Sequence, residues 1–443
     1  MFENRSFDHM LGHLKYEGIN KNVDGLVDPL TQYVNLYKGD MYTAHKFQKD
    51  SQLDFDVPHD YNDVATQLAY DDTRKKYRMT GFVEAYANAN KIVPNKICDP
   101  TGFFPSTLVP ITSFLARTFC TCDRWFSALP TSTQPNRTIA FFGDTPIFDT
   151  KTRVIEAGNS IFTWMNNAKL RWRVYHDGLS FFSLYPNQWP FVLGPNFKDF
   201  EYLQWDMMHD SPGEAPQVIL VEPSFEDARV AESKHPNDNH APLAVGWGED
   251  FLRRTYQAVT ANPDRWGSTV FIVYYDEHGG FADHVSPPAI GYTTTGALSY
   301  KFNSLGPRIP GIIVSPFVER GSICNLVLDH TSVLQFLAEL FTPGKPYSDT
   351  VQKRAQNGIH SISEALKAAK PITDIPVAPT TQINVSTSLG LPAPTAVQND
   401  MAQSFKQAAI RMLAEEPSGV AIKYPELAHL LIKSGANVQR KVE

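Results

Sequence analysis

The chain has 443 residues, of which 42% are apolar and 20% are charged, and its formal net charge is −7. This composition excludes a disordered, collagen-like or coiled-coil chain, and the length allows either two to three domains or one large α/β domain. There is no sustained Lys/Arg stripe, so nucleic-acid binding is not expected. No run of about 18 apolar residues is present, which predicts a chain without a transmembrane segment.

The first part of the chain predicts little regular structure. Residues 13–100 are polar and weakly periodic, which is typical of long loops with short helices, and loops of this length usually cover a site. Residues 111–119 place apolar side chains at helical spacing, with Ser106 or Thr112 as the capping residue.

Apolar runs and helical stretches then alternate. The runs predicted as buried strands are residues 138–142, 172–175, 217–221, 269–275 and 311–314. The predicted helices between them are residues 161–170, 247–261 and 332–341. This alternation predicts an α/β fold with a mostly parallel central sheet and helices on both faces, with the functional site beyond the carboxyl ends of the strands.

The C-terminal part differs in composition. Residues 369–397 are rich in Pro, Thr and Ser and predict an extended connection, while residues 400–414 and 424–434 predict two amphipathic helices. We therefore expect a main domain over residues 1–368, a connection over residues 369–397 and a helical appendage over residues 398–443. The four cysteines (Cys98, Cys120, Cys122 and Cys324) are too few for a disulfide scaffold and are interpreted as buried thiols.

Ionisable side chains gather directly after the predicted strand 269–275. Asp276, Glu277 and His278 are followed by two glycines and then by Asp283 and His284. Adjacent carboxylates are costly to bury unless a cation neutralises them, and carboxylates with imidazoles are ligands for divalent ions. A polar turn after a core strand is the alternative interpretation.

Two other segments carry groups suited to the same chemistry. Glu3 and Asn4 offer a carboxylate and an amide oxygen, although this segment also fits a capped helix start. Residues 129–138 contain several hydroxyls, Asn136 and Arg137 just before an apolar run, a pattern that fits a nucleophile with its anion-binding neighbours or an ordinary turn.

Taken together, these segments resemble one known family, the phosphoesterase family of phospholipases C and acid phosphatases. The matching motifs run in family order from residue 3 to about residue 340: Glu3-Asn4-Arg5-Ser6-Phe7-Asp8-His9, Thr133-Gln134-Pro135-Asn136-Arg137, Asn239-His240-Ala241-Pro242, Asp276-Glu277-His278-Gly279-Gly280 with Asp283-His284, Pro307-Arg308-Ile309-Pro310, and Asp329-His330-Thr331-Ser332. The resemblance implies an alkaline-phosphatase-like fold, a phosphoesterase catalytic domain over residues 1–368 and hydrolysis of a phosphate ester.

The resemblance also implies roles for individual residues. Thr133 matches the hydroxyl nucleophile, and the predicted ligands of the metal are Glu3, Asn4, Asp276 and Glu277. The histidines similar to the family's phosphate-contacting ones are His59, His176 and His240, and the residues expected to support the site are Asn136, Arg137, Asp283 and His284.

These residues predict phosphoryl transfer through a phospho-threonine, with one or more divalent ions as cofactor. Ca²⁺, Mg²⁺ and Mn²⁺ suit the oxygen ligands, and the nearby histidines also allow Zn²⁺. The middle motif favours a phospholipase C acting on a phospholipid, with peripheral membrane contact. The alternatives are a broad-specificity acid phosphatase acting on small monoesters and a non-catalytic lipid-binding relative.

The start of the chain departs from the family pattern. Only Met1 and Phe2 precede Glu3, where family members usually carry an apolar strand and often an export signal. Because family members often carry an export signal, the resemblance suggests a secreted or periplasmic protein, but this sequence shows no signal peptide. A frayed terminus would also hold Glu3 and Asn4 poorly.

Overall fold

The computed structural model describes residues 1–50, 52–228, 235–292, 294, 302–380, 399–425 and 427. Its contacts divide the chain into two compact units, and each is described by itself. Unit 1 comprises Met1–Thr150, Leu203–Ala215 and Asn237–Ser386, and unit 2 comprises Lys151–Tyr202, Pro216–Pro236 and Thr387–Glu443. The span 1–368, predicted from the sequence as one domain, contributes to both units.

Unit 1 contains a four-stranded sheet. Its strands lie in the order β11 (Phe271–Tyr274), β12 (Gly311–Val314), β7 (Cys120–Cys122) and β13 (Ile323–Cys324). Strand β12 is antiparallel to both β11 and β7, whereas β13 is parallel to β7. The α/β class is confirmed, but a mostly parallel arrangement is wrong for this sheet, because β12 returns against its neighbours.

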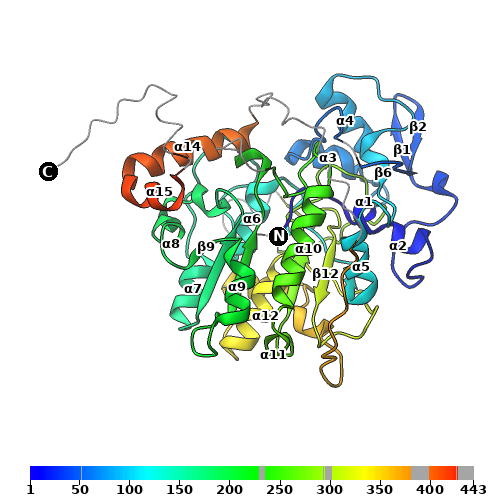
Figure 1. Ribbon diagram of the computed structural model, residues 1–443. Helices are drawn as coiled ribbons and strands as arrows, with labels where there is room; N and C mark the ends of the chain where they lie inside the picture. Colours follow the sequence, from blue (N-terminus) through cyan, green and yellow to red (C-terminus); the bar gives the residue numbers. More distant parts are fainter. Residues whose placement is uncertain are drawn as a thin grey trace. The chain divides into compact units, whose positions relative to one another are not determined.

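The remaining elements of unit 1 are short in its first hundred residues, as the sequence predicts, and longer afterwards (Figure 1). Its other strands are β1 (Val34–Tyr37), β2 (Asp40–Thr43), β3 (His45–Lys46), β4 (Tyr70–Asp71), β5 (Lys76–Tyr77) and β6 (Gly102–Phe103). Its helices are α1 (Phe7–Leu11), α2 (His13–Tyr16), α3 (Tyr61–Leu68), α4 (Phe82–Asn90), α5 (Pro110–Thr118), α6 (Thr133–Phe142), most of α9 (Tyr202–His209), α10 (Gly246–Val259), α11 (Pro263–Trp266), α12 (Thr331–Phe341) and α13 (Asp349–Gln356).

Helix α5 begins at a buried carboxylate rather than at the capping residues predicted from the sequence. Pro110 occupies its first turn, where no backbone donor is needed. The Glu249 side chain of α10 accepts hydrogen bonds from the backbone N–H groups of Ile111 (2.6 Å) and Thr112 (3.2 Å). Helices α5 and α10 therefore pack side by side, and α5 contacts strands β7 and β12 (Figure 1).

The predicted strand over residues 138–142 is wrong, because this run forms the second half of helix α6. Ser132, in an extended conformation, precedes the helix, and Gly143 ends it with a φ of 77°. A short apolar run does not distinguish a buried helix from a buried strand by periodicity, and the whole of α6 is buried. The other predicted strands and helices of unit 1 after residue 100 are present within a few residues.

Unit 2 contains a three-stranded parallel sheet, in the order β10 (Val218–Glu222), β8 (Trp172–His176) and β9 (Phe197–Asp199). Aromatic side chains form the core of this unit: the centroid of the Phe162 ring lies 4.6 Å from that of Trp172 and 4.5 Å from that of Phe182. Phe181, Phe182 and Tyr185 are fully buried and belong to this core. Its helices are α7 (Ile161–Asn167), α8 (Trp189–Val192), α14 (Asp400–Glu415) and α15 (Pro417–Lys423).

The C-terminal predictions are covered in part. Helix α14 confirms the helix predicted over residues 400–414. Most of the predicted connection and most of the predicted helix 424–434 lie outside the described residues. Within the described part of the chain, no helix has both the length and the apolar composition needed to cross a bilayer.

A glycine substitution tests how tightly the N-terminal segment packs. A Cβ atom at Gly279 (φ +62°) would lie 1.9 Å from the backbone oxygen of Asn4, so Gly279→Ala should lower the free energy of unfolding by about 3 kcal/mol or more. Gly344→Ala is the matched control, because Gly344 has a φ of +80° but no atom within 4 Å of a new Cβ. Its cost should be about 1–2 kcal/mol, from backbone strain alone. Urea denaturation measures both, and equal losses would contradict the close approach.

Candidate active site

Three chain segments meet at one end of the sheet of unit 1, where strands β11 and β7 have their carboxyl ends. Strands β11 and β7 run parallel to each other, since both are antiparallel to β12. Asp276 and Glu277 follow β11, and the chain that leaves β7 reaches Thr133 at the start of α6. Phe2 forms a parallel bridge with Tyr275, which brings Glu3 to the same end. The predicted site therefore lies beyond the carboxyl ends of these strands.

The N-terminal segment is held along its whole length. The N–H of Phe2 donates to the carbonyl of Tyr274 (2.9 Å), and the N–H of Glu3 donates to the carbonyl of Asp238 (2.8 Å). The Phe2 ring is buried and stacks on that of Tyr275, with the ring centroids 5.5 Å apart. Glu3 and Asn4 therefore follow a segment that is tied to the end of β11, through the bridge and the ring contact between Phe2 and Tyr275.

Asn4 lies at the centre of the group. Its backbone N–H donates to Oδ1 of Asp276 (3.1 Å), and its φ is 60°, in the left-handed region that Asn tolerates better than most residues. Its side-chain oxygen accepts a hydrogen bond from the Thr133 hydroxyl (3.4 Å), and its Nδ2 lies 3.2 Å from Nε2 of His59. Asn4 thus connects Thr133 with His59, and all three side chains are buried or nearly so.

Arg137 joins the two acidic segments. Its Nε donates to Oδ2 of Asp276 (2.9 Å), and its Nη2 lies 3.1 Å from Oε1 of Glu3. Arg137 and its neighbour Asn136 are both fully buried on α6. The Asn136 side chain instead holds the turn before the helix, donating to the carbonyls of Leu129, Thr131 and Ser132.

Two of the three predicted histidines lie near this group. Nε2 of His59 is 3.8 Å from Oε1 of Glu277, and the rings of His59 and His240 are 5.9 Å apart. His240 contacts the carbonyl of Ala241 through Nδ1. His176 lies in unit 2, at the end of β8, with Nδ1 2.7 Å from the carbonyl of Gly178. Its phosphate-contacting role stays a prediction.

Burial and charge shift the pKa values of this group. Burial raises the pKa of Glu3 well above its ordinary value although Arg137 opposes the shift, and it also raises the pKa of Asp276. Burial acts in the same direction on Glu277, but His59 and His278 outweigh it and lower the pKa of that carboxyl. Burial opposes the charged form of His59, yet the Glu277 carboxylate raises its pKa to about 9.

The donor set fits a divalent cation. Three carboxyl groups, those of Glu3, Asp276 and Glu277, lie around the guanidinium of Arg137 and the imidazole of His59. Oε1 of Glu277 is buried and accepts no hydrogen bond from the described residues. A buried carboxylate oxygen without a hydrogen bond is costly, and carboxylate, amide and hydroxyl oxygens are hard ligands.

A second cluster of ionisable groups supports the loop after Glu277. Ligand atoms of Asp8, Asp283 and His284 lie within 4.8 Å of one another, the arrangement of a metal site. The guanidinium of Arg308 already neutralises them, donating to Asp283 (Nε to Oδ1, 2.9 Å) and to Asp8 (Nη2 to Oδ1, 3.0 Å). Asp283 and His284 thus have a supporting position, and a cation is already supplied by the chain.

The sequence did not assign a role to Asp8 or Arg308, although both belong to motifs that carried the family resemblance. No spacing within either motif reveals that they meet, because they are 300 residues apart in the chain. Asp8 and Arg308 each stand among apolar residues in the sequence, which indicates burial. Because buried charges need partners, this pattern could have suggested that the two residues pair.

His284 gives this cluster a pH signature. Burial opposes its charged form, but Asp8 and Asp24 outweigh it and raise the pKa of His284 to about 10. Because the folded pKa exceeds the unfolded value of about 6.5, its contribution to stability is complete below pH 6.5 and is lost as the pH rises to 10. The difference in unfolding free energy between wild type and His284→Asn should shrink over this window, by at most about 1.4 kcal/mol per pH unit. A constant difference in urea denaturation from pH 6.5 to 10 would contradict the ion pairs.

Comparisons with known proteins agree with the resemblance seen in the sequence. The family model described as the Phosphoesterase family matches residues 1–342. The chain is 28% identical over 400 residues to non-specific phospholipase C3 of Arabidopsis thaliana, covering 85% of this chain and 74% of that protein. It is 25% identical over 502 residues to a non-hemolytic phospholipase C of Pseudomonas aeruginosa, covering 99% of this chain and 66% of that protein. The chain spans between 61% and 74% of the length of the Arabidopsis relatives.

Solved structures give a weaker similarity. A phosphonate monoester hydrolase of Agrobacterium radiobacter matches with a TM-score of 0.33 at 12% identity, covering 59% of this chain and 73% of that one. The lipoteichoic acid synthase LtaP from Listeria monocytogenes matches with a TM-score of 0.34 at 12% identity, covering 60% and 69%. At TM-scores below 0.5 these structures carry no argument, and the alkaline-phosphatase-like arrangement of the fold stays a prediction.

Proposed function

This chain belongs to the Phosphoesterase family, and we propose that it is a phosphoric ester hydrolase of the phospholipase C type with Thr133 as its nucleophile. Relatives from a plant and from a bacterium both carry the name phospholipase C, which supports this class of substrate. The observation that carries the proposal is the position of the Thr133 hydroxyl. It lies at the start of α6 and is hydrogen-bonded to Asn4 within the group of buried acids.

The start of α6 suits an anionic substrate. The first backbone N–H groups of a helix have no partner within it, and the helix dipole is positive at this end. A phosphate group next to Thr133 would meet this positive end, and the imidazole of His59 lies on the other side of Asn4. These groups would orient the ester and offset its charge without moving.

A divalent cation is the second part of the proposal. Asn4, Asp276 and Glu277, with Glu3 next to them, are the residues that would hold it. When bound, it would offset the charge of the phosphate oxygens and lower the pKa of the Thr133 hydroxyl. It would also keep Glu3 and Asp276 ionised, since burial raises the pKa of both carboxyls.

The proposed reaction has two steps. In the first, the Thr133 oxygen attacks phosphorus and passes its proton to water, while the bond from phosphorus to the diacylglycerol oxygen breaks and that oxygen takes a proton from His240. In the second, water attacks the phospho-threonine and gives a proton back to His240. The bond from phosphorus to the Thr133 oxygen breaks, the Thr133 oxygen regains a proton from water, and the phosphorylated headgroup leaves. The Nδ1 of His240 faces Ala241, so its Nε2 would deliver the proton.

Variants of Thr133 test the nucleophile. Thr133→Val keeps the shape of the side chain without the hydroxyl and should lower kcat on phosphatidylcholine by about 10³-fold or more, whereas Thr133→Ser should stay within about tenfold of wild type. Unchanged thermal unfolding checks that both variants fold. A Thr133→Val variant with near-wild-type turnover would remove Thr133 from the mechanism.

The same assay, run with p-nitrophenyl phosphate, decides the substrate class. We expect the wild-type protein to prefer phosphatidylcholine. A preference for the monoester by orders of magnitude would assign an acid phosphatase instead, and lipid binding without any turnover would assign a non-catalytic relative.

Metal removal tests the cation. Dialysis against a chelator should lower turnover on phosphatidylcholine by about 10²-fold or more, and adding back Ca²⁺, Mg²⁺, Mn²⁺ or Zn²⁺ one at a time should identify the ion that restores it. Asp276→Asn should weaken restoration, so that more of the ion is needed for half-maximal turnover. Full turnover in excess chelator would show that Arg137 and His59 suffice.

A further inference from the structure

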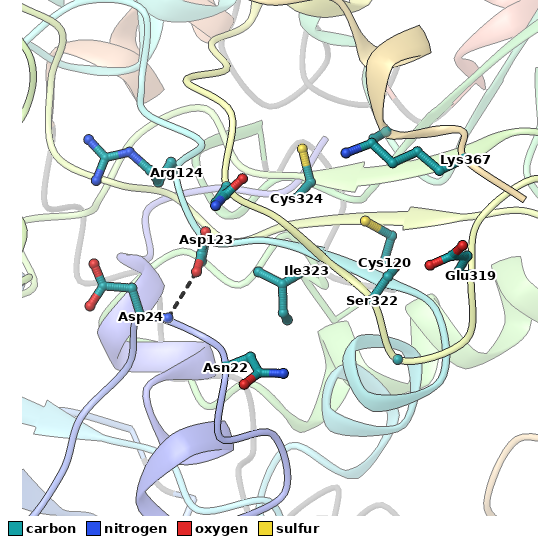
Figure 2. Close-up of a pocket in the computed structure, with 13 residues that line it drawn as sticks. Asn22, Asp24, Cys120, Asp123, Arg124, Glu319, Ser322, Ile323, Cys324 and Lys367 are labelled. Atoms are coloured by element: carbon teal, nitrogen blue, oxygen red, sulfur yellow. Dashed lines mark hydrogen bonds between the residues drawn. The ribbon is translucent and has the colours of Figure 1, made fainter.

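A cavity of about 660 Å³ in unit 1 lies apart from the candidate active site. Two thiols line it, those of Cys120 on β7 and Cys324 on β13, and charged side chains stand around them (Figure 2). The charged residues are Asp24, Asp123, Arg124, Glu319 and Lys367. No step of the proposed hydrolysis uses any of these groups.

Strand pairing places a third thiol with the other two. Cys324 is the register partner of Cys122 in the parallel pair β13–β7. Cys120 and Cys122 are two positions apart on one strand, so their side chains point to the same face of the sheet, as does that of a register partner. All three cysteines are free, buried thiols, and Cys122 does not line the cavity.

We propose that Cys324 is a modification site, at which it forms a mixed disulfide with a low-molecular-weight thiol of the amino-acid or peptide class held in this cavity. The incoming group is the symmetrical disulfide of that thiol. The Cys324 thiolate attacks one sulfur, a new bond forms to Sγ, and the bond between the two incoming sulfurs breaks. The second half leaves as a thiolate and takes a proton from water, so Cys324 is oxidised and half of the reagent is reduced.

The charges around the cavity suit a zwitterionic ligand. Figure 2 shows Lys367 extending toward Cys324, with Arg124 also at the cavity. These two cations suit the carboxylates of an amino-acid ligand, and Glu319 and Asp24 suit its ammonium group. Lys367 is exposed, so substituting it should leave the fold intact.

The surroundings of Cys324 support its reactivity. A hydrogen bond from Cys122 lowers its pKa to about 7 against the effect of burial, with help from Lys367. Burial has the opposite effect on the thiol of Cys98, whose pKa it raises to about 12 with the help of Asp99. Because the thiolate is the attacking species, Cys98 serves as an internal reference thiol for Cys324.

Cys122 is a poor resolving thiol for the mixed disulfide, because burial raises its pKa well above the ordinary value and leaves little thiolate to attack Sγ of Cys324.

Thiol mapping on the folded full-length chain tests the proposal. The protein is incubated with glutathione disulfide at pH 7.5, the remaining thiols are alkylated after unfolding, and each cysteine is assigned by peptide mass spectrometry. We expect one glutathionyl group per chain, on Cys324, formed at least about tenfold faster than on Cys98. Cys324→Ser should abolish the adduct, and Cys98→Ser should not change it.

A surface variant separates the binding site from simple thiol reactivity. Lys367→Gln should slow the reaction with glutathione disulfide several-fold more than the reaction with the uncharged 2-hydroxyethyl disulfide, which also controls for folding. Equal labelling of Cys98 and Cys324, labelling only after unfolding, an adduct on Cys120 alone, or a disulfide within the chain would each overturn the proposal. If Lys367→Gln slowed the reactions with both disulfides equally, the cavity charges would have no role in binding the reagent.

Discussion

The ion pairs of the Arg137 guanidinium are the contacts on which the candidate site depends. Arg137 bonds to Asp276 after β11 and to Glu3 at the start of the chain, while its own helix α6 begins with Thr133. Three segments that are far apart in sequence are therefore fixed to one another by a single buried cation. Breaking such a pair leaves an uncompensated buried charge, which costs several kcal/mol, so the geometry of these segments is tightly constrained.

A second buried arginine, Arg308, also joins two acidic segments. Arg308 bonds to Asp8 on helix α1 and to Asp283 in the loop that follows Glu277. It also donates to the backbone carbonyls of Asp24 and Asp123, both of which line the thiol cavity. Arg137 thus joins the beginning of the N-terminal segment to the beginning of the loop after β11, and Arg308 joins later parts of the same two segments. Arg308 also holds the backbone of Asp24 and Asp123, so one side chain supports both the candidate site and the cavity wall.

The residues named for the site from the sequence include several that lie together in the structure, whereas the predicted course of the sheet does not hold for unit 1. Asn4, Thr133 and His59 were named through the resemblance to the phosphoesterase family, and only the acids after residue 275 stood out locally, because they follow an apolar run. The antiparallel course of β12 could not be found in this way, because a fully apolar strand such as Gly311–Val314 looks the same in either direction. The run 138–142 was misassigned for a related reason, since tertiary burial on all sides makes a helix as apolar as a strand.

Residue 4 shows how closely backbone and chemistry can be joined at one position. Its φ of 60° restricts the choice to side chains that tolerate a left-handed backbone, chiefly Gly, Asn and Asp. Glycine would remove the amide that reaches both the hydroxyl and the imidazole, and aspartate would add another negative charge to a group already rich in acids. Among these three side chains, asparagine is the one that offers an uncharged donor and acceptor together, so a single side chain meets both the backbone and the chemical requirement at this position.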